Sequence, residues 1–201
     1  MGKELEYKLH VADRAALDAI LADGEVTALA VEPWRRTRMK TTYFDTADRR
    51  LAQLRWMLRR RMEGEESVVC LKTPENEAHV RGEWQILSDA VDDAAIERLL
   101  AQGAPQELRA LCDGTPFLPI CGAEFLRRST MLVFPDASRA ELAGDSGFLH
   151  GAAEQLPFTE LELELYGGSP EEMLALVQRL SARYGLCEEP LSKAARAMQL
   201  A

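Results

Sequence analysis

The sequence has few residues of the kinds that build zinc sites and no segment that suits a membrane. Its 201 residues include three histidines and four cysteines, and no two cysteines form a CxxC pair. This scarcity argues against a structural zinc site, because such sites need cysteine and histidine at short, regular spacing. No apolar run approaches the roughly 18 residues that a membrane-spanning helix needs. We therefore expect neither structural zinc nor a membrane partner.

Positive charge is also in short supply. Lysine and arginine total 24 against 33 aspartate and glutamate residues, which gives a net charge of -9. Such a balance argues against a general nucleic-acid surface as the partner. The sequence also lacks a GxxxxGK[ST] loop, which excludes a P-loop nucleotide-binding enzyme. Because the cysteines show no disulfide framework and no apolar leader opens the chain, we expect a reduced, cytoplasmic protein.

What the chain does contain is a repeated alternation of charged and apolar residues. Residues 4–8 read Glu-Leu-Glu-Tyr-Lys, and residues 159–165 read Thr-Glu-Leu-Glu-Leu-Glu-Leu. In a strand, successive side chains point to opposite faces, so each segment has one charged and one apolar face. Three carboxylates about 7 Å apart along one strand repel one another. The pattern therefore predicts a cation among them.

The order of the expected elements indicates an α+β fold. We expect strands at 4–9, 38–45, 56–63, 67–73, 80–87, 125–134, 139–148 and 158–166. An apolar, partly β-branched run at 26–31 is compatible with a further strand. Helices are expected at 12–22, 93–102, 106–111, 169–184 and 191–196. About eight strands joined mainly by short turns predict one antiparallel sheet that curls into a barrel within a single domain, residues 1–201.

The charged faces of these strands allow two interpretations. If the apolar faces look outward to a cover of helices, the charged faces line an interior tunnel, where they need partners, water or a charged ligand. Alternatively, the charged faces are the solvated outside of a sandwich with an apolar core. The residue types favour a ligand. Guanidinium groups bind phosphate oxygens, and clustered carboxylates suit Mg²⁺ or Mn²⁺. A metal on carboxylates next to a phosphate chain is typical of phosphoryl transfer.

Several short motifs follow one another along the chain. An ExExK motif at residues 4–8 opens it, and an ExExE motif stands at residues 160–164. Between and after them stand Tyr43-Phe44-Asp45-Thr46, Leu58-Arg59-Arg60-Arg61, Leu71-Lys72, Arg81-x-Glu83, Glu141 with Asp145, and Ser192-Lys193-Ala194-Ala195-Arg196. In this order the motifs resemble the CYTH superfamily, also called triphosphate tunnel metalloenzymes, and most closely its bacterial inorganic triphosphatase branch. Gln85 departs from the pattern, since many members carry a carboxylate there. The helical CHAD domain of many bacterial relatives is not expected within these 201 residues.

The resemblance implies an eight-stranded antiparallel β-barrel tunnel that hydrolyses inorganic triphosphate to pyrophosphate and phosphate with Mg²⁺ or Mn²⁺. The metal ligands that it implies are Glu4, Glu6, Glu162 and Glu164, with Glu160 and Asp145 nearby. The phosphate-binding residues that it implies are Lys8, Arg59, Arg61, Lys72, Arg81, Arg128 and Lys193. Glu83 is expected to position a second metal or the attacking water, with Lys8 and Arg59 as further catalytic residues.

Two other functions fit the same tunnel. A nucleoside triphosphatase or class IV-type adenylyl cyclase needs a pocket for base and ribose, for which the sequence shows no dedicated residues. A non-catalytic module would hold polyphosphate or a nucleotide without turning it over. In each case the partner is a small phosphate-bearing molecule. The sequence predicts no oligomeric state.

Overall fold

The computed structural model describes residues 5–112 and 114–201, apart from 75–80, and has a mixed α+β fold. The elements are β1 (Leu5–His10), α1 (Arg14–Leu21), α2 (Gly24–Leu29), β2 (Arg35–Asp45), α3 (Arg50–Gln53), β3 (Met57–Glu63), β4 (Glu66–Pro74), β5 (Arg81–Leu87), α4 (Asp93–Ala101), α5 (Glu107–Cys112), β6 (Leu118–Val133), β7 (Arg139–His150), β8 (Gln155–Gly167), α6 (Glu171–Tyr184), β9 (Cys187–Glu188) and α7 (Lys193–Met198). None of the described helices is both long and apolar enough to span a bilayer.

The strands form one sheet in the order β5-β4-β3-β2-β6-β7-β8-β1-β9. The expected class, α+β with a large antiparallel sheet, is confirmed. The expected eight-stranded barrel differs in two respects. A ninth strand is present, because two-residue β9 pairs with β1. In the described residues the sheet is also not closed, since its order ends at β5 and β9.

The chain divides into two compact units. Unit 1 comprises residues 1–37, 125–148 and 156–192, and unit 2 comprises residues 38–124, 149–155 and 193–201. The long strands β2, β6, β7 and β8 contribute residues to both units. Each unit has its own apolar core and its own set of charged residues.

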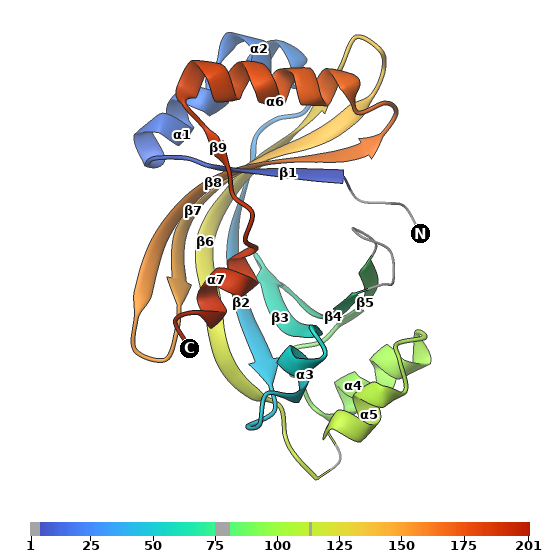
Figure 1. Ribbon diagram of the computed structural model, residues 1–201. Coiled ribbons are helices and arrows are strands. Elements are labelled where there is room, and N and C mark those ends of the chain that lie inside the picture. The colour runs from blue at the N-terminus through green and yellow to red at the C-terminus, as the bar shows by residue number, and fades with distance from the viewer. Residues whose placement is uncertain (1–4, 75–80, 113) are drawn as a thin grey trace. The chain divides into compact units, whose positions relative to one another are not determined.

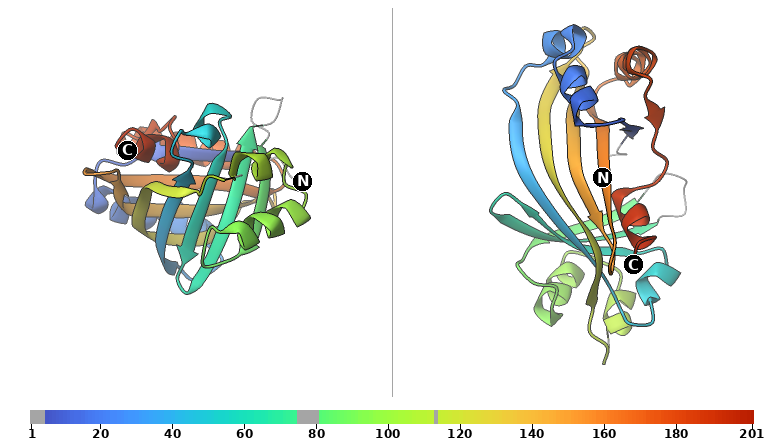
Figure 2. Two further views of the ribbon diagram at one scale, coloured as in Figure 1. Left: turned by 90° about the horizontal axis from the view of Figure 1, so that it is seen from below. Right: turned by 90° about the vertical axis from the view of Figure 1, so that its left-hand side faces the viewer.

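In unit 1, helices α1, α2 and α6 cover one face of the strands (Figures 1 and 2). Leu9 of β1 and Leu161 and Leu163 of β8 belong to one buried cluster with Leu17 of α1 and Met173 of α6. Burying each such side chain contributes about 1.5–3 kcal/mol. Because strand side chains alternate, the charged residues of β1 and β8 point away from these helices. The expected cover of helices over the apolar face is therefore present in this unit.

Unit 2 follows the same plan with other helices. Leu58 of β3, Leu71 of β4 and Ile86 of β5 form a buried cluster with Leu99 of α4 and Leu108 of α5. Figure 1 shows α4 and α5 beside β3, β4 and β5. Alternation again sends the neighbouring charged side chains of β3 and β4 to the face opposite the helices.

The run at 26–31, which the sequence allowed as a further strand, lies mostly in helix α2. Asp23 caps that helix by accepting a hydrogen bond from the Glu25 backbone nitrogen at 2.8 Å. The Thr27 hydroxyl donates to the Asp23 carbonyl oxygen at 3.0 Å. These local bonds stabilise a helix start against the modest strand preference of β-branched residues. The N-cap expected at Asp13 is present, since its carboxylate accepts from the Ala16 nitrogen at 2.8 Å.

Candidate functional site

The pairing of β1 with β8 brings the two charged motifs together in unit 1. Glu6 lies opposite Glu164, and Lys8 lies opposite Glu162. Residues directly opposite in an antiparallel pair share a face, with Cβ atoms about 4.5–5.5 Å apart. The early and late motifs therefore meet on one face, opposite the helices. Glu4, the first residue of the early motif, lies outside the described residues.

Three carboxylates of unit 1 lie close enough together to bind one metal ion. One oxygen from each of Asp145, Glu160 and Glu162 lies within 4.8 Å of the other two. Asp145 and Glu160 are fully buried. Hard divalent cations such as Mg²⁺ and Mn²⁺ prefer oxygen ligands of this kind. The donor set therefore fits such a cation, and this group of residues is called the acidic cluster below.

Arg127 of β6 contacts the acidic cluster directly. Its Nε donates to Asp145 Oδ1 at 2.8 Å, and one terminal nitrogen donates to Asp145 Oδ2 at 2.7 Å and to Glu162 Oε2 at 2.5 Å. Burial disfavours the charged guanidinium, but the bonds and charge of Asp145 outweigh this cost and raise the pKa of Arg127 above its usual value. Arg127 is therefore a fixed positive charge that offsets part of the repulsion among these carboxylates.

Sequence reasoning missed Arg127 and selected its neighbour Arg128. The structure does not bring Arg128 to the acidic cluster, because adjacent residues of a strand point to opposite faces. Its guanidinium instead forms an ion pair with Asp18 of α1 at 2.5 Å. No clear signal in the sequence decides this choice, because residues 125–134 carry apolar side chains at both odd and even positions.

A second acidic position lies beside the cluster. Glu141 of β7 accepts a hydrogen bond from Arg35 of β2 at 3.1 Å. Burial raises the pKa of Glu141, and the positive charges of Arg127 and Arg35 only partly oppose this. The negative charges of Asp145 and Glu162 raise it further. Glu141 therefore binds a proton more readily than an exposed glutamate.

Unit 2 carries its own group of positive charges, on β3 and α7. Arg59 lies opposite Tyr43 and Arg61 opposite Thr41, whose hydroxyl accepts from Arg61 Nε at 3.1 Å. Burial raises the pKa of Tyr43, and the charges of Arg59, Arg61 and Lys193 act in the other direction. The charges of three predicted phosphate-binding residues therefore act on Tyr43. Arg59 Nε is buried and has no hydrogen-bond partner in the described part of the chain.

The remaining predicted residues of unit 2 lie on β4 and β5. Lys72 forms an ion pair with Glu83, with its Nζ 2.8 Å from Glu83 Oε2. The backbone of Arg81 lies opposite Pro74 at the start of β5. The Arg81 side chain is not among those described, so its predicted contact with phosphate stays a prediction.

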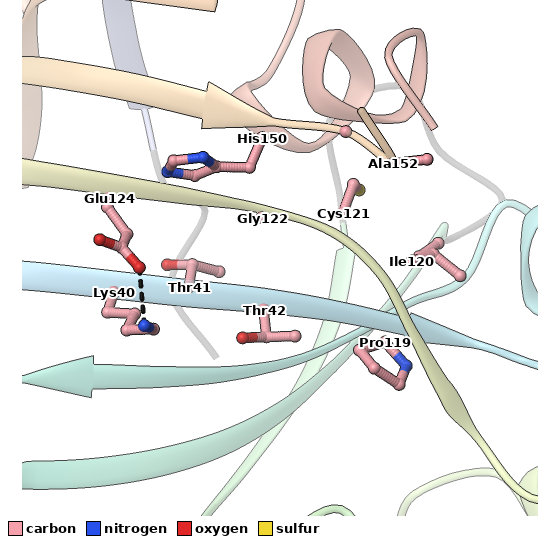
Figure 3. A pocket seen from close by; sticks show the side chains of 11 residues that line it. Lys40, Thr41, Thr42, Pro119, Ile120, Cys121, Gly122, Glu124, His150 and Ala152 are labelled. Atoms are coloured by element: carbon pink, nitrogen blue, oxygen red, sulfur yellow. Dashed lines mark ion pairs between the residues drawn. The ribbon is translucent and has the colours of Figure 1, made fainter. Parts of the chain in front are cut away.

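Two cavities have linings that include no residue of the acidic cluster. The first, of about 370 Å³ in unit 2, has an ion pair between Lys40 and Glu124 at 2.7 Å on its wall (Figure 3). None of its lining residues is a predicted site residue. The second, of about 230 Å³ in unit 1, is lined by Arg128 together with Asp18 and Trp34. We therefore identify the candidate site by its charged groups rather than by these cavities.

Comparison with known proteins gives one family match and several similar folds. The family model described as "CYTH domain" matches residues 2–198. HpAC1 from Hippeastrum, a candidate adenylyl cyclase for which a dominant triphosphatase activity is described, is 18% identical, with 98% of this chain and 95% of that chain covered and a TM-score of 0.62. PH1819 from Pyrococcus horikoshii is 15% identical, with 97% and 99% covered and a TM-score of 0.55. A candidate adenylate cyclase from Bacillus halodurans is 15% identical, with 95% and 96% covered and a TM-score of 0.54. At these identities the likeness shows the fold alone.

Proposed function

The chain belongs to the CYTH domain family, and from this premise we propose that it hydrolyses inorganic triphosphate to pyrophosphate and phosphate with a divalent metal. Proteins of this family typically act on phosphoanhydride bonds and depend on a divalent metal. The observation that carries the proposal is the acidic cluster with Arg127 fixed against it. The triphosphatase activity described for HpAC1 supports the choice of reaction.

The acidic cluster would hold the metal. Asp145, Glu160 and Glu162 supply the closest set of oxygens, and Glu6 and Glu164 follow on the same face of β1 and β8. We also include Glu4 among the proposed metal ligands, because it is the first residue of the motif at residues 4–8. When bound, Mg²⁺ or Mn²⁺ supplies positive charge that polarises phosphoryl oxygens and orients the substrate.

The basic residues would bind the phosphate chain. A triphosphate carries several negative charges, and its hydrolysis depends mainly on positioning and on neutralising those charges. Guanidinium forks bind phosphate oxygens in pairs, whereas lysine ammonium groups act as point charges. We include Arg127 in place of Arg128, whose charge is paired with Asp18. The proposed set is Lys8, Arg59, Arg61, Lys72, Arg81, Arg127 and Lys193.

The reaction itself needs water and no covalent intermediate. A water oxygen bonds to the terminal phosphorus while the bond from that phosphorus to the bridging oxygen breaks, and pyrophosphate leaves. The proton of the water passes to a carboxylate or to solvent.

One panel of assays tests this proposal against its alternatives. Phosphate release and cyclic AMP formation are measured with triphosphate, ATP and thiamine triphosphate, each with Mg²⁺, with Mn²⁺ and with a chelator. Rapid phosphate release from triphosphate that stops with the chelator supports the proposal. Cyclic AMP from ATP would instead support the cyclase that the names of two similar structures suggest. Binding without turnover would support a phosphate-binding module.

A further inference from the structure

The carboxylate of Glu83 accepts from three donors of unit 2. Lys72 Nζ lies 2.8 Å from Glu83 Oε2. The Gln85 amide donates to Glu83 Oε1 at 2.5 Å, and the Cys70 thiol donates to the same oxygen at 3.2 Å. The side chains of Lys72 and Glu83 are each 20% exposed, so the pair is largely shielded from water. Both oxygens of Glu83 are therefore engaged by protein groups.

The register of β4 and β5 produces this arrangement. Lys72 lies opposite Glu83, and Cys70 lies opposite Gln85, so all four side chains share one face. Burial raises the pKa of Glu83, but the bond and charge of Lys72 and the bonds from Cys70 and Gln85 lower it overall. Glu83 is consequently ionised at neutral pH and is a strong acceptor for the Lys72 ammonium.

We infer that Glu83 is a positioning residue that fixes the Lys72 ammonium for a phosphate oxygen of the substrate, and that Gln85 and Cys70 hold Glu83 in this role. The inference rests on the proposed function. A lysine ammonium has three donors, so Lys72 keeps two for a phosphate after its bond to Glu83. Without an anchor, its long stem would lose rotamer freedom when phosphate binds.

The amide at Gln85 is important for this arrangement. A carboxylate at this position would stand beside Glu83 on the same face and repel it. It would also compete for Lys72 and attract a further cation. The amide instead donates a hydrogen bond to Glu83. Gln85 thus leaves Lys72 as the cation that Glu83 binds. This role differs from the expected one, in which Glu83 positions a second metal or the attacking water.

A double-mutant cycle tests the inference through KM and kcat for triphosphate. Glu83→Gln keeps the shape of the side chain and removes its charge, so we expect KM to rise about tenfold with kcat changed less than about twofold. Lys72→Met is expected to raise KM at least as much. In the Lys72→Met background, Glu83→Gln should have no further effect, because Glu83 acts through Lys72. Gln85→Leu removes a donor without changing charge and should raise KM in the same direction by a smaller factor.

Binding of Mn²⁺ without substrate, followed by electron paramagnetic resonance, separates positioning from metal binding. Glu83→Gln should keep the wild-type affinity and number of Mn²⁺ ions. Glu97→Gln is the matched control, because Glu97 pairs with Arg109 at an exposed site of α4, and it should change nothing. Additive effects of Glu83→Gln and Lys72→Met on KM would overturn this inference and leave the proposed function standing. Loss of a bound Mn²⁺ in Glu83→Gln would do the same. A wild-type protein without triphosphatase activity would overturn the proposed function and this inference with it.

Discussion

Arg127 and Asp145 form a two-bond pair between β6 and β7, with nitrogen to oxygen distances of 2.8 and 2.7 Å. A guanidinium held in this way is a preorganised charge, because its orientation is set before any substrate arrives. The same group also reaches Glu162, so it connects the two strands that carry the acidic cluster. Because Arg127 and Arg128 point to opposite faces of β6, substituting each residue in turn measures its effect on activity separately.

Arg127→Ala should lower kcat/KM for triphosphate by about a hundredfold or more, the usual effect of removing a preorganised donor from a charged transition state. Arg128→Ala is the matched control, since it removes an arginine from the opposite face of the same strand. It should leave kcat/KM within about threefold of wild type and affect mainly stability, through the lost pair with Asp18. Equal losses of activity in the two variants would contradict the assignment of Arg127.

Glu162→Gln should abolish triphosphate hydrolysis and weaken Mn²⁺ binding by about tenfold or more, because an amide is a poorer metal ligand than a carboxylate. The substitution is nearly isosteric, so the circular dichroism spectrum should not change. Glu171→Gln, at the exposed start of α6, is the control for loss of one negative charge in the same unit. Full activity with normal Mn²⁺ binding in Glu162→Gln would remove Glu162 from the metal site.

Most of the fold could be predicted because its signals are local. The two-residue alternation of β1 and β8 and the turns between later strands predicted an antiparallel sheet, while alternation alone left open what covers its apolar face. The family match confirms the CYTH resemblance. The helix at α2 has a tertiary support besides its local cap. The carboxylate that caps this helix, Asp23, is also held by Arg183 and Tyr184 of α6, about 160 residues away. No local pattern shows that contact.

The sequence motifs identified individual site residues, but they did not show which of these residues lie together in the fold. The alternation of charges showed that Glu6 and Glu164 lie on charged faces, but the register that makes them opposite is a property of the folded pair. The choice between Arg127 and Arg128 depends on which face of β6 meets the helices, and the two adjacent arginines alone leave this open. Likewise, the three donors on Glu83 depend on the register of β4 and β5.

Removal of divalent metal should lower thermal stability. The three carboxylates of the acidic cluster repel one another, and an ion that binds only the folded state stabilises it by mass action, by about 2.7 kcal/mol at a concentration one hundred times its Kd. We therefore expect Mn²⁺ to raise Tm in differential scanning calorimetry and a chelator to reverse the increase. In Glu162→Gln the increase should be much smaller. An equal increase in both proteins would indicate that the stabilising ion binds elsewhere.

The Asp23 carboxylate should make stability depend on pH in the acid range. Burial raises the pKa of Asp23, but its bonds from Arg183, from the Glu25 backbone and from Tyr184 lower it overall, below the ordinary 3.8. A carboxyl with a lowered pKa in the folded state stabilises the fold above its unfolded pKa, and this contribution is lost as pH falls through the folded value. Asp23→Asn should therefore lower the free energy of unfolding by about 1 kcal/mol at pH 7.

The difference between wild type and Asp23→Asn should shrink as pH falls from 5 toward 2, because protonation removes the same negative charge from the wild-type residue. Urea denaturation of both proteins at several pH values measures this difference. Asp136→Asn is a suitable control, since Asp136 has a lowered pKa through Ser138 in a turn rather than through an ion pair with α6. A difference between wild type and Asp23→Asn that stays constant from pH 7 to pH 2 would show that the charge of Asp23 does not stabilise the junction of α2 and α6, and that the carboxyl acts there only by its shape.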